Sequence, residues 1–160
     1  MMRRIAGLAG SLCFALLLWG VCAAQDGSYK EQMGKIVEEA GRLASSLQTN
    51  TLDFASYDKW HKDFKTESDY FIKSFVKTHK SRESFTLMQK GIDGFSLAWS
   101  MLNQAKYADI QYKESLVLDA VGDAHKWKNS AVEKKKKAIE TITQAVEDLK
   151  SARKAQEGEG

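Results

Sequence analysis

Few residues of this 160-residue chain could do chemistry, and its three histidines come first. In a set of antiparallel helices, a rise of 1.5 Å per residue places His61, His79 and His125 at three different levels, so no two of them would share a site. A di-iron bundle also needs a Glu-x-x-His motif from each of two helices, and the sequence contains none. The sequence therefore predicts no metal centre.

Haem is the second possibility. A covalent c-type haem needs a Cys-x-x-Cys-His motif, and the chain has none. A b-type haem held by His61 and by Met33 or Met101 stays open, as does a pocket for another small ligand. Five residues would line that pocket, four of them aromatic at helical spacing: Tyr57, Trp60, His61, Phe95 and Trp99. The alternative is that this aromatic stripe is packed core.

The sequence contains no motif for nucleophilic catalysis or for phosphate binding. No serine stands in a Gly-x-Ser-x-Gly turn, and the sequence has no glycine-rich phosphate loop. Adjacent carboxylates such as Glu38 and Glu39 diverge on a helix, because side chains meet at spacings of three or four residues. We therefore expect a protein that is not an enzyme.

The first 24 residues have the features of an export signal. Arg3 and Arg4 precede an apolar run over 5–21, and Cys22-Ala23-Ala24 offers small residues before a cut at Gln25. We predict cleavage there and a periplasmic or secreted protein. Two alternatives are an uncleaved membrane anchor and lipid attachment at Cys22, although Val21 fits the lipoprotein pattern poorly.

Removal of this segment changes the composition. Both cysteines, Cys13 and Cys22, leave with it, so disulfides and thiol chemistry are excluded from the mature chain. Without Arg3 and Arg4 the chain carries 22 basic and 21 acidic residues, which does not favour nucleic-acid binding. The mature length suits a single domain over 25–155, followed by a disordered tail over 156–160.

The chain contains no proline and few alternating runs, so the fold class is all-α. Apolar residues at three- and four-residue steps predict helices at about 28–48, 53–79, 81–107 and 111–153, in an antiparallel up-down four-helix bundle. Ser81 would cap the third helix. The last helix is either continuous or broken at 128–130, because 126–137 is nearly all polar.

Two surfaces follow if the last helix is continuous. Its lysines would lie level with the turn between the second and third helices and form a basic end that could bind an anionic envelope surface or an acidic partner. The residues of this basic end are Lys73, Lys77, Lys80, Arg82, Lys128, Lys134, Lys135, Lys136 and Lys137. The alternative is a solvated lysine face that keeps the protein soluble.

The second surface is the apolar stripe that follows those lysines. On the same length count Ile139, Ile142, Val146 and Leu149 would extend past the hairpin and contact a protein partner or a second copy. A chain that folds back near Asn129 would bury them instead. The sequence thus predicts an exported, non-enzymatic interaction module without cofactor, with a sensor-like small-ligand or haem-binding bundle as the alternative.

Overall fold

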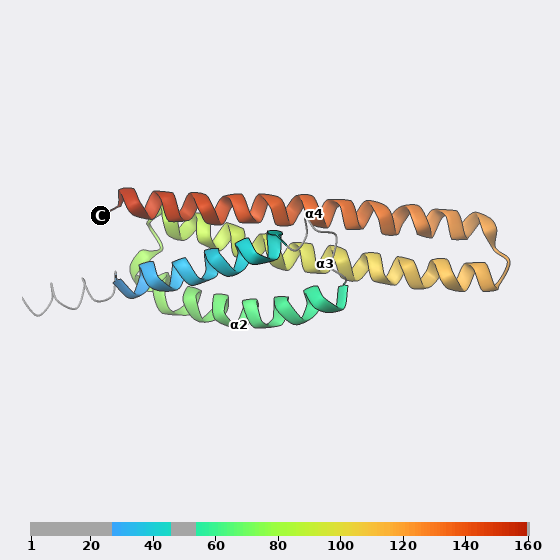
Figure 1. Ribbon diagram of the computed structural model, residues 1–160, viewed down its shortest axis with the longest axis horizontal. Helices are drawn as coiled ribbons and strands as arrows, with labels where there is room; N and C mark the ends of the chain where they lie inside the picture. Colours follow the sequence, from blue (N-terminus) through green and yellow to red (C-terminus); the bar gives the residue numbers. More distant parts are fainter. Residues whose placement is uncertain (1–26, 46–53, 160) are drawn as a thin grey trace, which may run out of the picture.

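The computed structural model describes residues 27–45 and 54–159, and all regular structure in these ranges is helical (Figure 1). An N-terminal helix spans 27–45, α2 spans Phe54–His79, α3 spans Glu83–Val117 and α4 spans Val121–Gly158. The predicted all-α class is confirmed for the described residues, which form four helices. The predicted export signal, with Cys13 and Cys22, lies outside the described residues. No described helix combines the length and apolar character needed to span a membrane.

The aromatic face of α2 forms the centre of the core. Tyr57, Phe64, Phe71 and Phe75 are all buried, at the three- and four-residue steps that put them on one side of the helix. Their rings meet rings of both neighbours: Phe64 lies 4.9 Å from Phe95 of α3, and Tyr29 of the N-terminal helix stacks on Phe71 at 5.4 Å. These contacts hold the N-terminal helix and α3 against α2.

α3 and α4 pair along their whole length through small residues. Alanine recurs every seventh residue of α4, and all five of these alanines are buried: Ala124, Ala131, Ala138, Ala145 and Ala152. A strict seven-residue repeat keeps one seam of a helix facing its partner, as in a left-handed coiled coil. The small side chains allow the two backbones to approach closely.

Two glycines of α3 are required by this close approach. A Cβ on Gly91 would stand 2.6 Å from the Leu149 Cδ2 atom, and one on Gly94 would stand 2.8 Å from the Ala145 Cβ atom. Both separations are shorter than carbon atoms tolerate in a packed interior. These glycines, which cost helix propensity, are therefore explained by the α3–α4 contact.

The turn between α3 and α4 lies at Leu118–Ala120, whereas the sequence predicted it between 107 and 111. Asp119 has a φ of 59°, the left-handed conformation of a tight turn. α3 continues past residue 107 because Ala108 and Ser115 remain buried in the seam with α4. The alternative break at 128–130 is absent: α4 is continuous there, and Ala131 packs in the seam.

The start of α3 is capped by the far end of the chain. Arg82, and not Ser81, is the N-cap residue, and it makes no side-chain cap. Instead the Glu159 carboxylate accepts hydrogen bonds from the Ser84 backbone N–H (2.9 Å) and from its hydroxyl (2.7 Å). Ser84 Oγ also bonds the Tyr29 hydroxyl at 2.9 Å, and burial raises the pKa of Tyr29 to about 12. α4 accordingly continues to Gly158, where the sequence predicted a tail from residue 156.

Candidate functional site

The far part of the α3–α4 hairpin projects beyond the rest of the bundle (Figure 1). α2 begins level with Lys106, whose Nζ lies 4.8 Å from the centre of the Phe54 ring. From Lys106 to the end of α3 at Val117 is roughly 17 Å at 1.5 Å per residue. Beyond the start of α2, Figure 1 shows α3 and α4 alone among the described helices.

The sequence of α3 changes character at this level. The heptad positions that face α2 and the N-terminal helix hold large apolar residues in the bundle, ending at Trp99 and Leu102. One heptad further, Trp99 is followed by Lys106 and then Lys113, and Leu102 is followed by Asp109. The core-facing side of α3 therefore becomes charged where the covering helices end.

α4 changes at the same level. Leu149 and Ile142 are buried in the core, and the next two residues at this heptad position are Lys135 and Lys128. Lys135 forms an ion pair of 2.6 Å with Asp109 across the hairpin. Asp109 is the residue one heptad after Leu102 on α3, and Lys135 is the first charged residue after Leu149 and Ile142 at their heptad position on α4. The ion pair therefore marks the end of the apolar core on both helices.

Exposed apolar residues stand among these charges. We name the core-facing side of the projecting part, together with Ile139 at its boundary with the bundle, the hairpin face. It comprises Lys106, Asp109, Lys113 and Leu116 from α3, and Val121, His125, Lys128, Val132, Lys135 and Ile139 from α4. Its four aliphatic residues are exposed, with Val132 at 61%. Val117 and Leu118 are exposed beside it at the turn.

The basic residues predicted to meet at one end are not brought together. Lys73, Lys77, Lys80 and Arg82 lie around the α2–α3 turn. Because the α3–α4 turn is ten residues later than predicted, Lys134–Lys137 lie level with about residue 104 of α3, roughly 30 Å away. Lys137 pairs with Glu133 at 2.6 Å and Lys136 with Glu140 at 3.9 Å, both within α4.

The predicted C-terminal stripe lies mostly inside the bundle. Ile142, Val146 and Leu149 are buried, and Ile139 is 46% exposed. Ile139 lines a hollow of about 180 Å³ between α4 and Ala44 of the N-terminal helix. The expected overhang is therefore at the opposite end of α4, since the later turn shifts α4 along α3.

The five residues of the predicted pocket do come together. His61 stacks between Tyr57 (6.1 Å) and Trp99 (5.5 Å), and Trp60 lies 5.2 Å from Phe95. Three of the five also form hydrogen bonds: Tyr57 donates to the Phe95 carbonyl at 3.0 Å, Trp99 to Asp58 at 2.8 Å and Trp60 to Glu39 at 2.8 Å. The rings fill the space between α2 and α3 with one another.

His61 is the unusual member of this cluster. It is 6% exposed, and its Nε2 atom has no hydrogen-bond partner among the described residues. Burial lowers its pKa, and Lys65 nearby lowers it further. Hydrogen bonds from Lys62 and then Trp99 hold the pKa of the neighbouring Asp58 below its ordinary value.

The haem ligands proposed from the sequence are not arranged around a common space. The sulfur of Met101 accepts a hydrogen bond from Thr141 of α4 at 3.7 Å, and His61 is enclosed by its ring neighbours. Within the described ranges, no group of three or more His, Cys, Asp or Glu side chains could hold a metal ion.

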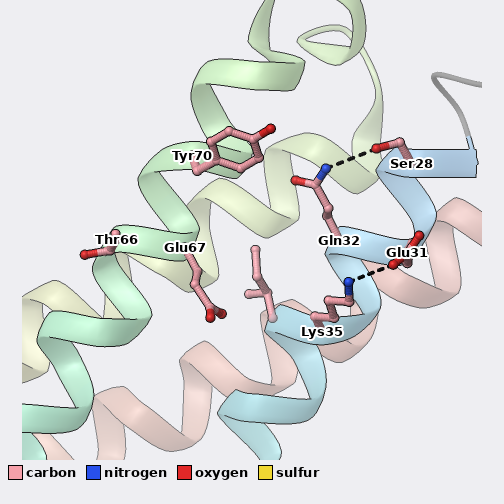
Figure 2. Close-up of a pocket in the computed structure, with 8 residues that line it drawn as sticks. Ser28, Glu31, Gln32, Lys35, Thr66, Glu67 and Tyr70 are labelled. Atoms are coloured by element: carbon pink, nitrogen blue, oxygen red, sulfur yellow. Dashed lines mark hydrogen bonds and ion pairs between the residues drawn. The ribbon is translucent and has the colours of Figure 1, made fainter.

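A groove between the N-terminal helix and α2 was not anticipated from the sequence. It has a volume of about 510 Å³, and Figure 2 shows side chains of both helices around it. Lys35 pairs with Glu31 at 2.7 Å and Gln32 donates to Ser28 at 3.0 Å, both within the N-terminal helix. It offers a ligand no buried, unpaired polar group among the described residues.

The hairpin face was also missed, although a signal for it exists. The alanine heptad of α4 fixes which side of the helix faces the core. At seven-residue steps from Leu149 towards the N-terminus of α4, the residue on that side changes from apolar to lysine at Lys135.

Comparisons with protein-family models, with curated proteins and with solved structures found no match for this chain.

Proposed function

We propose that the protein is an exported, non-enzymatic interaction module, an up-down four-helix bundle that binds a partner through its hairpin face. One observation carries the proposal: α3 and α4 both change from buried apolar to exposed mixed residues at the level where their covering helices end. A hairpin that served only to close the bundle would need no length beyond that level.

The composition of the hairpin face supports a binding role. A surface meant only for solvation would carry polar residues throughout, but this one keeps exposed aliphatic residues at four core-facing positions. Exposed apolar groups rimmed by charges are characteristic of protein interaction sites. Lys128 and Lys135, which lie on the hairpin face, keep the role of binding residues that the sequence suggested, at a new place in the fold.

Export is part of the proposal and rests on the sequence of residues 1–24. Mass spectrometry of the protein recovered from outside the cytoplasm tests it. A mature chain that begins at Gln25 supports cleavage, whereas a lipid on Cys22 or an intact N-terminus would replace it with one of the two anchored forms.

Site-specific photo-crosslinking in the native host tests the binding role. A benzophenone side chain at Val132 reports on the hairpin face, and one at Leu97, which is 53% exposed on α3, is the matched control. We expect a discrete covalent adduct from Val132 and none from Leu97. Adducts from Leu97 alone, or from neither position, would contradict the proposal.

The alternative function is that of a small-ligand or haem-binding bundle, and the unpaired Nε2 atom of His61 is the observation that favours it. Its test is an absorption spectrum of the protein purified from its host. A Soret band that disappears in His61→Ala would establish that function in place of the interaction module.

A further inference from the structure

The hairpin face consists of two paired helices without the two further helices that complete the bundle elsewhere. In the rest of the hairpin, the same heptad positions of α3 and α4 are covered by α2 and the N-terminal helix, as the buried Ile92 and Leu149 illustrate. Beyond Lys106 those positions have no covering helix in the described chain (Figure 1). A helix placed there would continue an existing layer of the molecule.

The charges on the hairpin face are mostly positive. Lys135 is neutralised by Asp109, and Lys106 lies over the Phe54 ring. Lys113 and Lys128 are exposed and form no ion pair within the described part of the chain. An occupant that brings carboxylates to these two lysines would therefore complement the face.

The apolar residues set the length of the occupant. Ile139, Val132 and Val121 follow one another along α4 at steps of seven and eleven residues, which keep them on one side of the helix. They extend over roughly 27 Å, the length of about 18 helical residues. Leu116 of α3 lies beside the end of this stripe.

We propose that the hairpin face binds an acidic amphipathic α-helix of a partner protein. The inference rests on the proposed function and names the partner's chemistry. The helix lies along the hairpin as α2 and the N-terminal helix lie along the bundle, as in other helix-in-groove complexes. Its apolar stripe covers Val121, Val132 and Ile139, and its carboxylates meet Lys113 and Lys128.

The charges argue against two other occupants. A second copy placed face to face would bring Lys113 and Lys128 of both chains together without acidic partners. An anionic lipid surface would meet the tip of the hairpin first, where Asp119 and Asp123 are exposed and would be repelled.

Methyl NMR of the purified exported protein tests the proposal with defined probes. The ligand is an 18-residue helical peptide with leucines at three- and four-residue steps and glutamates on its flanks. One control peptide replaces the glutamates by lysines, and the other has the same composition in an order that abolishes the apolar stripe. We expect the acidic peptide alone to shift the methyl resonances of Val121, Val132 and Ile139, with Leu97 unchanged.

Charge reversal makes the test specific. In Lys113→Glu/Lys128→Glu we expect the affinity for the acidic peptide to fall by at least about tenfold, and the lysine peptide to bind instead. Lys126→Glu/Lys154→Glu, outside the hairpin face, is the matched control and should bind as the wild type does. Equal binding of all three peptides, or no shift with any of them, would overturn the proposal.

The other occupants are outcomes of the same experiment. Shifts of these methyl groups with phosphatidylglycerol vesicles, or on raising the protein concentration without peptide, would replace the acidic helix by a membrane or by a second copy. If Val132 forms its crosslink in the host and the acidic peptide does not bind, the interaction module stands and only the acidic helix is refuted. If Val132 forms no crosslink and the acidic peptide does not bind, both the interaction module and the acidic helix are refuted.

Discussion

Gly94 of α3 lies against Ala145 of α4 so closely that a Cβ on the glycine would stand 2.8 Å from the alanine Cβ. The nearest atom is not the end of a flexible side chain, so it cannot move aside without the backbone. This pair sets the separation of the two long helices inside the bundle, and the buried alanines of α4 continue the same close packing into the projecting part.

We expect Gly94→Ala to lower the free energy of unfolding by about 1–3 kcal/mol, because overpacking outweighs the gain of roughly 1 kcal/mol in helix propensity. Gly41→Ala is the control, since a Cβ there meets nothing within 4 Å, and it should stabilise the protein by about 1 kcal/mol. Urea unfolding followed by circular dichroism measures both.

A compensating change separates this effect from a general loss of stability. Ala145→Gly removes the methyl group that Gly94→Ala would meet, so the double variant should be more stable than the two single changes predict. Strict additivity would show that the α3–α4 spacing is not limited by this pair.

Glu159→Ala should destabilise the protein by about 1–2 kcal/mol, because the Ser84 N–H and hydroxyl lose their acceptor at the start of α3. Glu157→Ala, which removes only an exposed ion pair with Arg153 of 4.0 Å, should change stability by less than about 0.5 kcal/mol. Chemical denaturation of the three proteins provides the comparison. Equal losses in the two variants would contradict the cap.

The buried His61 should make stability depend on pH. Burial lowers its pKa in the folded protein below the ordinary 6.5, so the unfolded chain binds a proton more readily. Its contribution is complete above about pH 6.5 and is lost as the pH falls towards the lowered value. We expect the unfolding midpoint of the wild type to fall more steeply between pH 7 and pH 5 than that of His61→Phe.

The acid-range behaviour of the same cluster has a separate cause. Asp58 has a pKa below its ordinary 3.8, so its contribution to stability is present above pH 3.8 and is lost at still lower pH.

For the His61 prediction, parallel curves of unfolding midpoint against pH for the wild type and His61→Phe, from pH 7 to pH 5, would show that the pKa of His61 does not change on folding.

Apolar replacement of the ion pair at the base of the hairpin face should create a dimer. Asp109→Leu/Lys135→Ile extends the core stripe of both helices by one heptad without a covering helix, and exposed stripes of this kind associate. Sedimentation velocity should show a concentration-dependent shift to twice the mass. Lys126→Ile, on the opposite side of α4, should leave the protein as it was, and a purely monomeric double variant would contradict the geometry.

The sequence predicted α2 closely, at 53–79 against the observed Phe54–His79, because bulky aromatic residues at helical steps contrast with the lysines and acids between them. It also predicted that Trp60, His61, Phe95 and Trp99 would lie in one cluster, and the rings of Trp60 and Phe95 lie 5.2 Å apart in it. Both predictions depend on large side chains, for which periodicity is a strong signal.

The α3–α4 turn was misplaced for the opposite reason. The seam beyond residue 107 is made of small residues, which give only a weak hydrophobic signal in the sequence: Ala108, Ser115, Ala124 and Ala131. The tight turn carries no glycine or proline, and Asp119 supplies the left-handed residue. The predicted basic end depended on that turn, so it was lost with it.

The alanine heptad has a consequence for how such a hairpin could vary in length. Removal or addition of seven residues in each arm would move the tip by roughly 10 Å and leave the same residues on the same side. Removal of three or four would turn the tip around the axis and carry its lysines away from the bundle layer. The reach of the hairpin can therefore change in steps of seven residues without a change of orientation, whereas a step of three or four residues changes both.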